Sequence, residues 1–297
     1  MEGRSTVIDL HCHTNISDNS LSVNQVLRLA KANGVTHLAI TDHNTTLGVN
    51  EGIGLGQQMG IEIIPGIEIS AYDYKRKGKV HILGYYIEPG HPTLEKMCIF
   101  LLESRKKSSL EMIQRVQDTG YQITWEQVKK YAPEGTGVFK QHIMHALMDQ
   151  GHCDRIFGSL YSTLFSTGED GREKGLAYVP MEYVDAVEAI QAIRAAGGVP
   201  VVAHPGQYDN FEAIEEWAEA GLEGLELFHP SHNIRDAWKI RSLAKEYNLV
   251  MTGGSDFHGL YGNPRSYPGC RRELGYRTIE ELKARAGSLK LENKRVF

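Results

Sequence analysis

Short apolar runs alternate with amphipathic helical segments along most of this 297-residue chain. Residues 7–10, 36–40, 61–64 and 199–203 have the composition of buried strands, and apolar residues three and four positions apart lie between them. Repeated strand–helix alternation is typical of a parallel α/β architecture. In barrels of this class the active site lies at the carboxyl ends of the strands, so residues at those ends are the first functional candidates.

Histidines and carboxylates follow almost every predicted strand. The first strand carries His11 and His13, whose side chains point to the same face because strand residues alternate. Two such imidazoles can bind one metal ion, although a lone H-x-H pair is more often a pair of core histidines. The other strand ends carry His43, Glu68, His81, His204, Asp256 and His258. Six of the thirteen histidines thus fall at one level of the architecture, which favours a metal site over separate buried polar networks.

Composition argues against several function classes. The net charge of −5 gives no electrostatic footprint for nucleic acid or an anionic membrane, and no apolar run approaches membrane-spanning length. The four cysteines are far apart, which predicts reduced thiols rather than a disulfide framework. No signal peptide is visible at the amino terminus. We therefore expect a cytoplasmic protein with no stable nucleic-acid partner and no membrane partner.

A change of pattern separates the middle of the chain from both ends. Between residues 91 and 177 strand signals vanish and helical periodicity dominates. We predict a helical insertion over 91–177 that caps the substrate site, and a barrel domain formed by 1–90 and 178–297.

Six sequence blocks occur in order through both halves of the chain. They are DLHCHT at 9–14 followed by Ser17 and Asp18, TDH at 41–43, PGIEIS at 65–70, HILG at 81–84, AHP at 203–205 and GSDFHG at 254–259. These blocks resemble the signature motifs of the PHP family, named after polymerase and histidinol phosphatase domains. The pattern is most similar to the stand-alone metal-dependent phosphoesterases that act on nucleotides, which also carry a helical insertion and a block like HPSH at 229–232. The resemblance implies an α/β fold, a distorted seven-stranded TIM-like barrel with an inserted helical subdomain.

The resemblance also implies a cluster of two or three divalent metal ions. One ion would take His11, His13, Glu68 and Asp256, a second would share Glu68 and add His81 and His204, and a third would use Asp18, His43 and His258. This mixture of imidazole and carboxylate ligands favours Mn, Fe or Zn over Mg or Ca. Asn19 and Asn44 stand where the family usually has Gly and Asp, and both lie beside the predicted third site.

Such a cluster predicts hydrolysis of a small phosphate ester. We expect a hydroxide held between the first two ions to attack phosphorus in line with the leaving oxygen, beside Asp256, and His204 or His232 to protonate that oxygen. Substrate contacts are expected from Arg105, from Lys140 and His142, which resemble an Arg-x-His block, and from His232. Lysine lacks the planar fork of arginine, so the phosphate contact at Lys140 is expected to be weaker. A solvated helix face is the alternative for Arg105.

A nucleotide, either a mononucleotide or a 3',5'-bisphosphate, heads the expected substrates. Cyclic sugar phosphates, opened and then dephosphorylated, and histidinol phosphate are alternatives on the same scaffold. Amide hydrolysis is a further alternative, because metal-dependent barrels can catalyse it in the same way. A metal-stabilised structural module is the non-enzymatic alternative, but the complete ligand set favours an enzyme. The substrate is therefore expected to be a small phosphorylated molecule.

Overall fold

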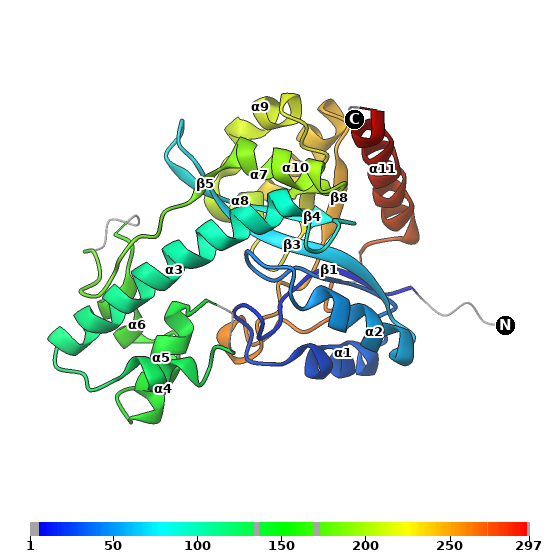
Figure 1. Ribbon diagram of the computed structural model, residues 1–297. Coiled ribbons are helices and arrows are strands. Elements are labelled where there is room, and N and C mark those ends of the chain that lie inside the picture. The colour runs from blue at the N-terminus through cyan, green and yellow to red at the C-terminus, as the bar shows by residue number, and fades with distance from the viewer. Residues whose placement is uncertain (1–5, 134–136, 169–172, 272, 296–297) are drawn as a thin grey trace.

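Seven strands form a nearly closed barrel in this computed structural model, which describes residues 6–133, 137–168, 173–271 and 273–295. The strand order is β1 (Ile8–Cys12), β2 (His37–Ile40), β3 (Glu62–Asp73), β4 (Gly78–Tyr85), β6 (Val199–Val202), β7 (Gly224–Phe228) and β8 (Val250–Gly253), and the short β5 (Val184–Asp185) pairs with β3. Helices surround the barrel (Figure 1). The predicted α/β fold with a distorted TIM-like barrel is confirmed.

One strand departs from the expected parallel arrangement. β4 runs antiparallel to both β3 and β6, whereas the other pairings are parallel. The strand predicted over 61–64 also continues to Asp73 as the twelve-residue β3. As a result Glu68 and His81 lie within two long paired strands rather than at strand ends, and Ser70 is opposite His81 in the register.

The seam between β1 and β8 closes through the segment that follows β8. The Asp256 N–H donates to the carbonyl of His11 at 2.8 Å, directly beside the ends of both strands. The Asn19 amide donates to the carbonyls of His13 and Phe257, both at 2.9 Å. Asn19 therefore joins the two sides of the seam, which a glycine at this position could not do.

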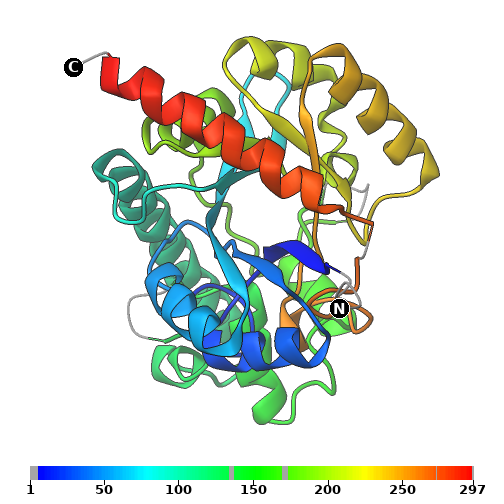
Figure 2. The ribbon, with the colours of Figure 1, turned by 90° about the vertical axis from the view of Figure 1, so that its right-hand side faces the viewer.

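The outer helices cover the barrel and one of its ends. They are α1 (Val23–Ala32), α2 (Val49–Met59), α7 (Ala186–Ala195), α8 (Pro205–Tyr208), α9 (Ile214–Glu219), α10 (Ile234–Glu246) and α11 (Tyr276–Arg295). The last helix, α11, lies across one end of the barrel (Figure 2). Its Ile279 and Leu282 are fully buried in one cluster with the barrel residues Leu10 and Val201. Since α11 covers that end, the opposite end remains for the site.

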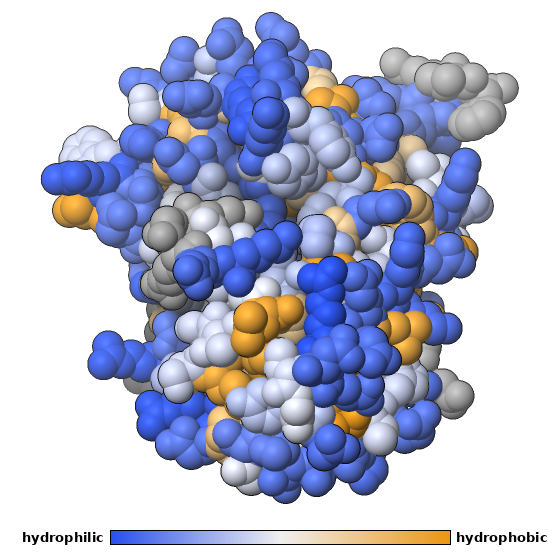
Figure 3. All heavy atoms as spheres, turned by 90° about the vertical axis from the view of Figure 1, so that its left-hand side faces the viewer, coloured by the Kyte–Doolittle hydropathy of each residue, from blue (hydrophilic) through white to orange (hydrophobic). Residues whose placement is uncertain are grey.

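Four helices lie toward that opposite end (Figure 1): α3 (Pro92–Asp118), which begins against the barrel and extends beyond it, α4 (Trp125–Lys129), α5 (Lys140–Asp149) and α6 (Ser159–Phe165). They share an apolar core that also takes in Tyr261 from the barrel side of the chain. The side of the molecule that they occupy is mostly hydrophilic, with a few apolar side chains in its lower half (Figure 3). The domain boundaries at 91 and 177 stay a prediction. None of the helices that the structure describes is both long and apolar enough to cross a membrane.

Candidate metal centre

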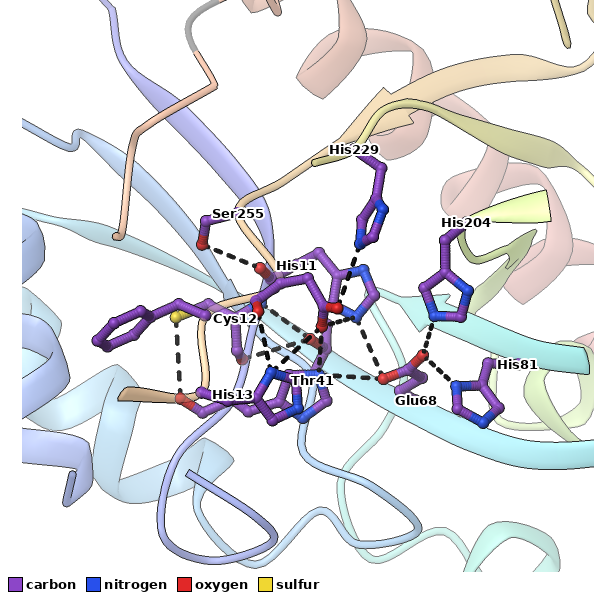
Figure 4. A network of polar contacts seen from close by, with 12 residues as sticks. His11, Cys12, His13, Thr41, Glu68, His81, His204, His229 and Ser255 are labelled. Carbon is purple, nitrogen blue, oxygen red and sulfur yellow. Dashed lines mark hydrogen bonds and ion pairs between the residues drawn. The ribbon is translucent and has the colours of Figure 1, made fainter. Parts of the chain in front are cut away.

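Glu68 on β3 is the centre of a cluster of buried imidazoles (Figure 4). Five ring nitrogens lie within 3.5 Å of its carboxylate: His11 Nε2 at 3.1 Å, His13 Nε2 at 3.0 Å, His43 Nδ1 at 3.4 Å, His81 Nδ1 at 2.9 Å and His204 Nε2 at 3.1 Å. Burial alone would raise the pKa of Glu68, but the charges of the surrounding imidazoles hold it well below its usual range. A carboxylate offers only about four lone-pair sites, so five imidazoles exceed what hydrogen bonding can satisfy. This crowding fits a carboxylate that bridges metal ions.

The four residues predicted for the first ion converge. The candidate donor atoms of His11, His13, Glu68 and Asp256 all lie within 4.8 Å of one another. The Nε2 atoms of both histidines lie 3.3 Å from Asp256 Oδ1. Neither ring nitrogen of the buried His13 has a hydrogen-bond partner among the described residues. An ion coordinated here would satisfy Nε2 of His13, so the residues fit a metal site.

The structure also gathers the residues predicted for the second and third ions. His81 and His204 both approach Glu68 Oε1, the carboxylate oxygen that the first two histidines do not contact. Asp18, His43, His258 and His13 form another group with donor atoms within 4.8 Å. His43 is also grouped with Glu68 and His81, so it stands between the second and third sites.

The departure from the family pattern at Asn44 has a structural explanation. Its side-chain oxygen accepts the N–H of Ser70 at 2.8 Å, and its amide donates to the Ser70 hydroxyl at 3.1 Å. Asn44 therefore braces the loop after β2 against β3 and does not need to offer a donor to the third site.

Two residues of the cluster, Glu226 and His229, were not among the predicted ligands and substrate contacts, although His229 begins the HPSH block. Glu226 lies fully buried on β7, where its Oε1 is 3.0 Å from His11 Nδ1 and its Oε2 accepts the backbone N–H of His204 at 2.8 Å. Burial would raise the pKa of Glu226, but His11 and His229 lower it to about 2. A carboxylate inside the apolar run 224–228 was the signal that could have identified it.

Three residues at or beside the cluster have a strained backbone. Asn44, His204 and Asp256 have positive φ angles of 56°, 28° and 49°, although none of them is glycine. Each such conformation costs roughly 1–3 kcal/mol and persists only where surrounding contacts enforce it. Here the Glu226 carboxylate holds the His204 backbone, and the His11 carbonyl holds the Asp256 backbone.

A cavity of about 220 Å³ opens beside His43 and His81, and we call it the cationic cavity. Its lining includes the predicted contacts Arg105 and Lys140, together with Lys79, which the sequence analysis did not identify. The Arg105 guanidinium lies 3.8 Å from the centre of the Phe139 ring, and burial lowers its pKa without discharging it. The cavity therefore presents positive charge next to the cluster.

His142 and His232 are placed differently from the expectation. Nδ1 of His142 accepts the N–H of Phe139 at 3.2 Å, and the fully buried ring is not in the lining of the cationic cavity. His232 donates from Nδ1 to the Leu227 carbonyl at 2.9 Å and accepts the Gly206 N–H on Nε2 at 3.2 Å. Both nitrogens of His232 are thus committed to the backbone, and the geometry gives its predicted role as proton donor no support.

Comparison with known proteins agrees with this geometry. Residues 9–220 match the family model of the PHP domain. The chain is 40% identical over 254 residues to the phosphoribosyl 1,2-cyclic phosphate 1,2-diphosphodiesterase of Eggerthella lenta, covering 86% of this chain and 95% of the relative. It is 28% identical over 256 residues to the 3',5'-nucleoside bisphosphate phosphatase of Chromobacterium violaceum, covering 84% and 87%. A solved structure of a candidate metal-dependent phosphoesterase from Bifidobacterium adolescentis superimposes with a TM-score of 0.83 at 28% identity, covering 96% and 98%.

Proposed function

Because this chain belongs to the PHP domain family and is a metal-dependent phosphoesterase, we propose that it hydrolyses a sugar phosphate that carries a cyclic phosphate diester. The observation that carries this proposal is the cationic cavity, which opens directly beside the Glu68 cluster. A substrate with one phosphate at the cluster and a second phosphate in that cavity would engage both. The relative at 40% identity is named for a phosphoribosyl substrate of this kind.

The donor set is suited to two or three ions of Mn, Fe or Zn. Glu68 would be shared between ions, with His11, His13 and Asp256 on one side and His81 and His204 on the other. Divalent ions bound there would activate a water molecule and neutralise charge on the phosphoryl oxygens.

The residues of this chain have separate tasks in the proposal. Glu226 fixes the orientation of His11 and of the His204 backbone, which keeps the donors in place. Arg105 and Lys140 bind the phosphate that is not cleaved, and Lys79 adds positive charge on the β4 side of the cavity. The Phe139 ring supports the Arg105 guanidinium and limits its contact with water.

A second candidate substrate is a nucleoside 3',5'-bisphosphate. One observation favours it: a second cavity of about 500 Å³ contacts the cluster at Asp18, Asp256 and His258. This volume falls in the range of about 300–1,000 Å³ that holds small-molecule ligands. Among the described residues its lining carries no lysine or arginine and includes the ring of Phe157, so it has room for an uncharged base. The relative at 28% identity is named for such a substrate.

A substrate comparison with purified enzyme tests the proposal. The protein is stripped with a chelator, reloaded with Mn, and assayed for kcat/KM on ribose 5-phosphate 1,2-cyclic phosphate, adenosine 3',5'-bisphosphate and an aryl phosphate. We expect the cyclic sugar phosphate to be the best substrate and the Asp256→Asn variant to be inactive on all three. A tenfold preference for the nucleoside bisphosphate would establish the second candidate instead. Hydrolysis of none of the esters by the reloaded enzyme would refute both.

A further inference from the structure

His229 follows β7 and faces the cluster, although it is neither a predicted metal ligand nor a predicted substrate contact. Its side chain points from the strand toward the same centre as His11 and His204 (Figure 4). The residue is only 4% exposed, and its Nε2 atom lies 3.2 Å from Asp256 Oδ2. Despite this position, Nε2 makes no hydrogen bond to any described residue. Its neighbour is thus a carboxylate assigned to the first ion, at ion-pair distance but without the alignment of a hydrogen bond, so Nε2 can still interact with a ligand.

The hydrogen bonds of the other ring nitrogen determine what that ligand can be. Nδ1 of His229 accepts the backbone N–H of Ser231 at 3.1 Å and lies 2.7 Å from the Ser231 hydroxyl. A backbone N–H can only donate, so Nδ1 must present a lone pair and the proton of the neutral ring is on Nε2. A protonated Nε2 has no lone pair for a metal ion. It is instead a hydrogen-bond donor.

The surroundings hold this donor in place. Arg271 donates to the His229 carbonyl at 3.0 Å and fixes the backbone after β7. His229 also lines the cavity of about 500 Å³, together with Asp256 and His258 from the cluster. The His229 side chain therefore lies where a ligand from this cavity would reach the cluster.

We propose that His229 is a further catalytic residue, whose Nε2–H donates a hydrogen bond to a phosphoryl oxygen of the substrate. The inference rests on the proposed function, because it needs a phosphate ester bound at the cluster. No proton is transferred, since the neutral imidazole keeps its proton and stabilises the charge that develops on the oxygen. Within the block 229–232 the two histidines thus differ: His232 braces the backbone, and His229 contacts substrate.

Two variants and a control test this role. His229→Phe retains a ring without a donor, His229→Gln retains an N–H donor, and His152→Phe makes the same change at an exposed histidine outside the site. We expect His229→Phe to lower kcat/KM about 100-fold, as the loss of one oxyanion donor does in other enzymes, and His229→Gln to recover part of that loss. Bound metal per chain, measured by elemental analysis, should equal that of the wild type in all three variants. Calorimetry should show weaker binding of inorganic phosphate to metal-loaded His229→Phe.

Two results would overturn the inference. Loss of one ion per chain in His229→Phe would make His229 a ligand rather than a donor. A kcat/KM of His229→Phe within about threefold of the wild type would remove it from the reaction. If the wild type hydrolyses no phosphate ester, the proposed function fails. The calorimetry then still decides this inference, because equal phosphate affinities of wild type and His229→Phe would refute it and a weaker affinity in the variant would support it.

Discussion

The site has two walls, and their residues reach it in different ways. The barrel wall consists of the Glu68 cluster, whose side chains lie on β1, β3, β4 and β7 and in the segments that follow β1, β2, β6, β7 and β8. The helical wall consists of Arg105 on α3 and Lys140 and Gln141 on α5. Strand register places the donors of the barrel wall, whereas the packing of helices against the barrel end places the helical wall.

This difference predicts that the barrel wall determines the chemistry and the helical wall determines the substrate selectivity. In the barrel wall, buried donors contact one another within a few ångströms, so the loss of one donor leaves the others unsatisfied. In the helical wall, Arg105 and Lys140 are only partly buried and lie over the rings of Phe139 and Tyr178. Changes there should alter substrate binding while the cluster stays intact.

Glu68→Gln should have the largest effect. An amide cannot bridge two cations as a carboxylate does, and it would place an N–H₂ group among five imidazoles. We expect kcat/KM to fall at least about 1,000-fold, beyond the 10- to 100-fold typical of residues that only orient ligands. Elemental analysis should show fewer bound ions. Glu62→Gln, the same change at an exposed position of the same strand, is the control and should retain wild-type activity and metal content.

Glu226→Gln should weaken metal binding about 100-fold, at the upper end for a residue behind the ligands. Glu226 accepts from His11 Nδ1, which leaves Nε2 of that ring available to an ion, and an amide nitrogen turned toward Nδ1 would disturb this arrangement. Competition with a fluorescent chelator measures the affinity. Glu223→Gln, on the segment just before β7 and paired with Arg194 and Arg285, is the control. An unchanged affinity in Glu226→Gln would show that His11 is oriented without this carboxylate.

Most of the barrel wall could be predicted from the sequence. The motifs containing His11, Glu68, His204 and Asp256 lie on or beside strands, and the strand order of an α/β barrel brings such residues to one end. Local alternation correctly placed His11 and His13 on one face, and Cys12 between them packs in a separate apolar cluster.

The remaining features depend on contacts between distant segments. Nothing local distinguishes an antiparallel β4 from a parallel strand, so the position of Lys79 beside the site could not be predicted. The tautomer of His229 depends on a backbone N–H two residues away in a loop whose shape the sequence does not show. Helix packing likewise determines that Gln141 reaches the cluster through Asp18. Gln141 lies between Lys140 and His142, the two residues of this segment that the sequence predicted as substrate contacts.

Arg105→Gln should raise KM about 30-fold for a substrate with two phosphates and change kcat little. Loss of a charge-assisted hydrogen bond to a phosphate costs roughly 1.5–3 kcal/mol, and this contact is made equally in the ground state and the transition state. The KM for an aryl phosphate, which has no second phosphate, should stay near the wild-type value. Lys107→Gln on the exposed face of the same helix is the control. An equal rise in KM for both substrates would place Arg105 at the cleaved phosphate and would blur the separation between the two walls.

Gln141→Leu should give the smallest effect and is the sharpest test of how the walls are joined. The Gln141 amide donates to Asp18 Oδ2 at 2.9 Å. This hydrogen bond connects α5 directly to a predicted ligand of the third ion. Leucine keeps the size of the side chain but removes the donor, at a cost of about 1 kcal/mol, or about fivefold in affinity for the most weakly bound ion. A metal titration followed by calorimetry measures this, with Gln150→Leu on the exposed end of α5 as the control. A fivefold weakening confined to one ion would show that the helical wall tunes the third site through Asp18. Equal titrations of Gln141→Leu and wild type would mean that the barrel wall holds all of its ions without help from α5.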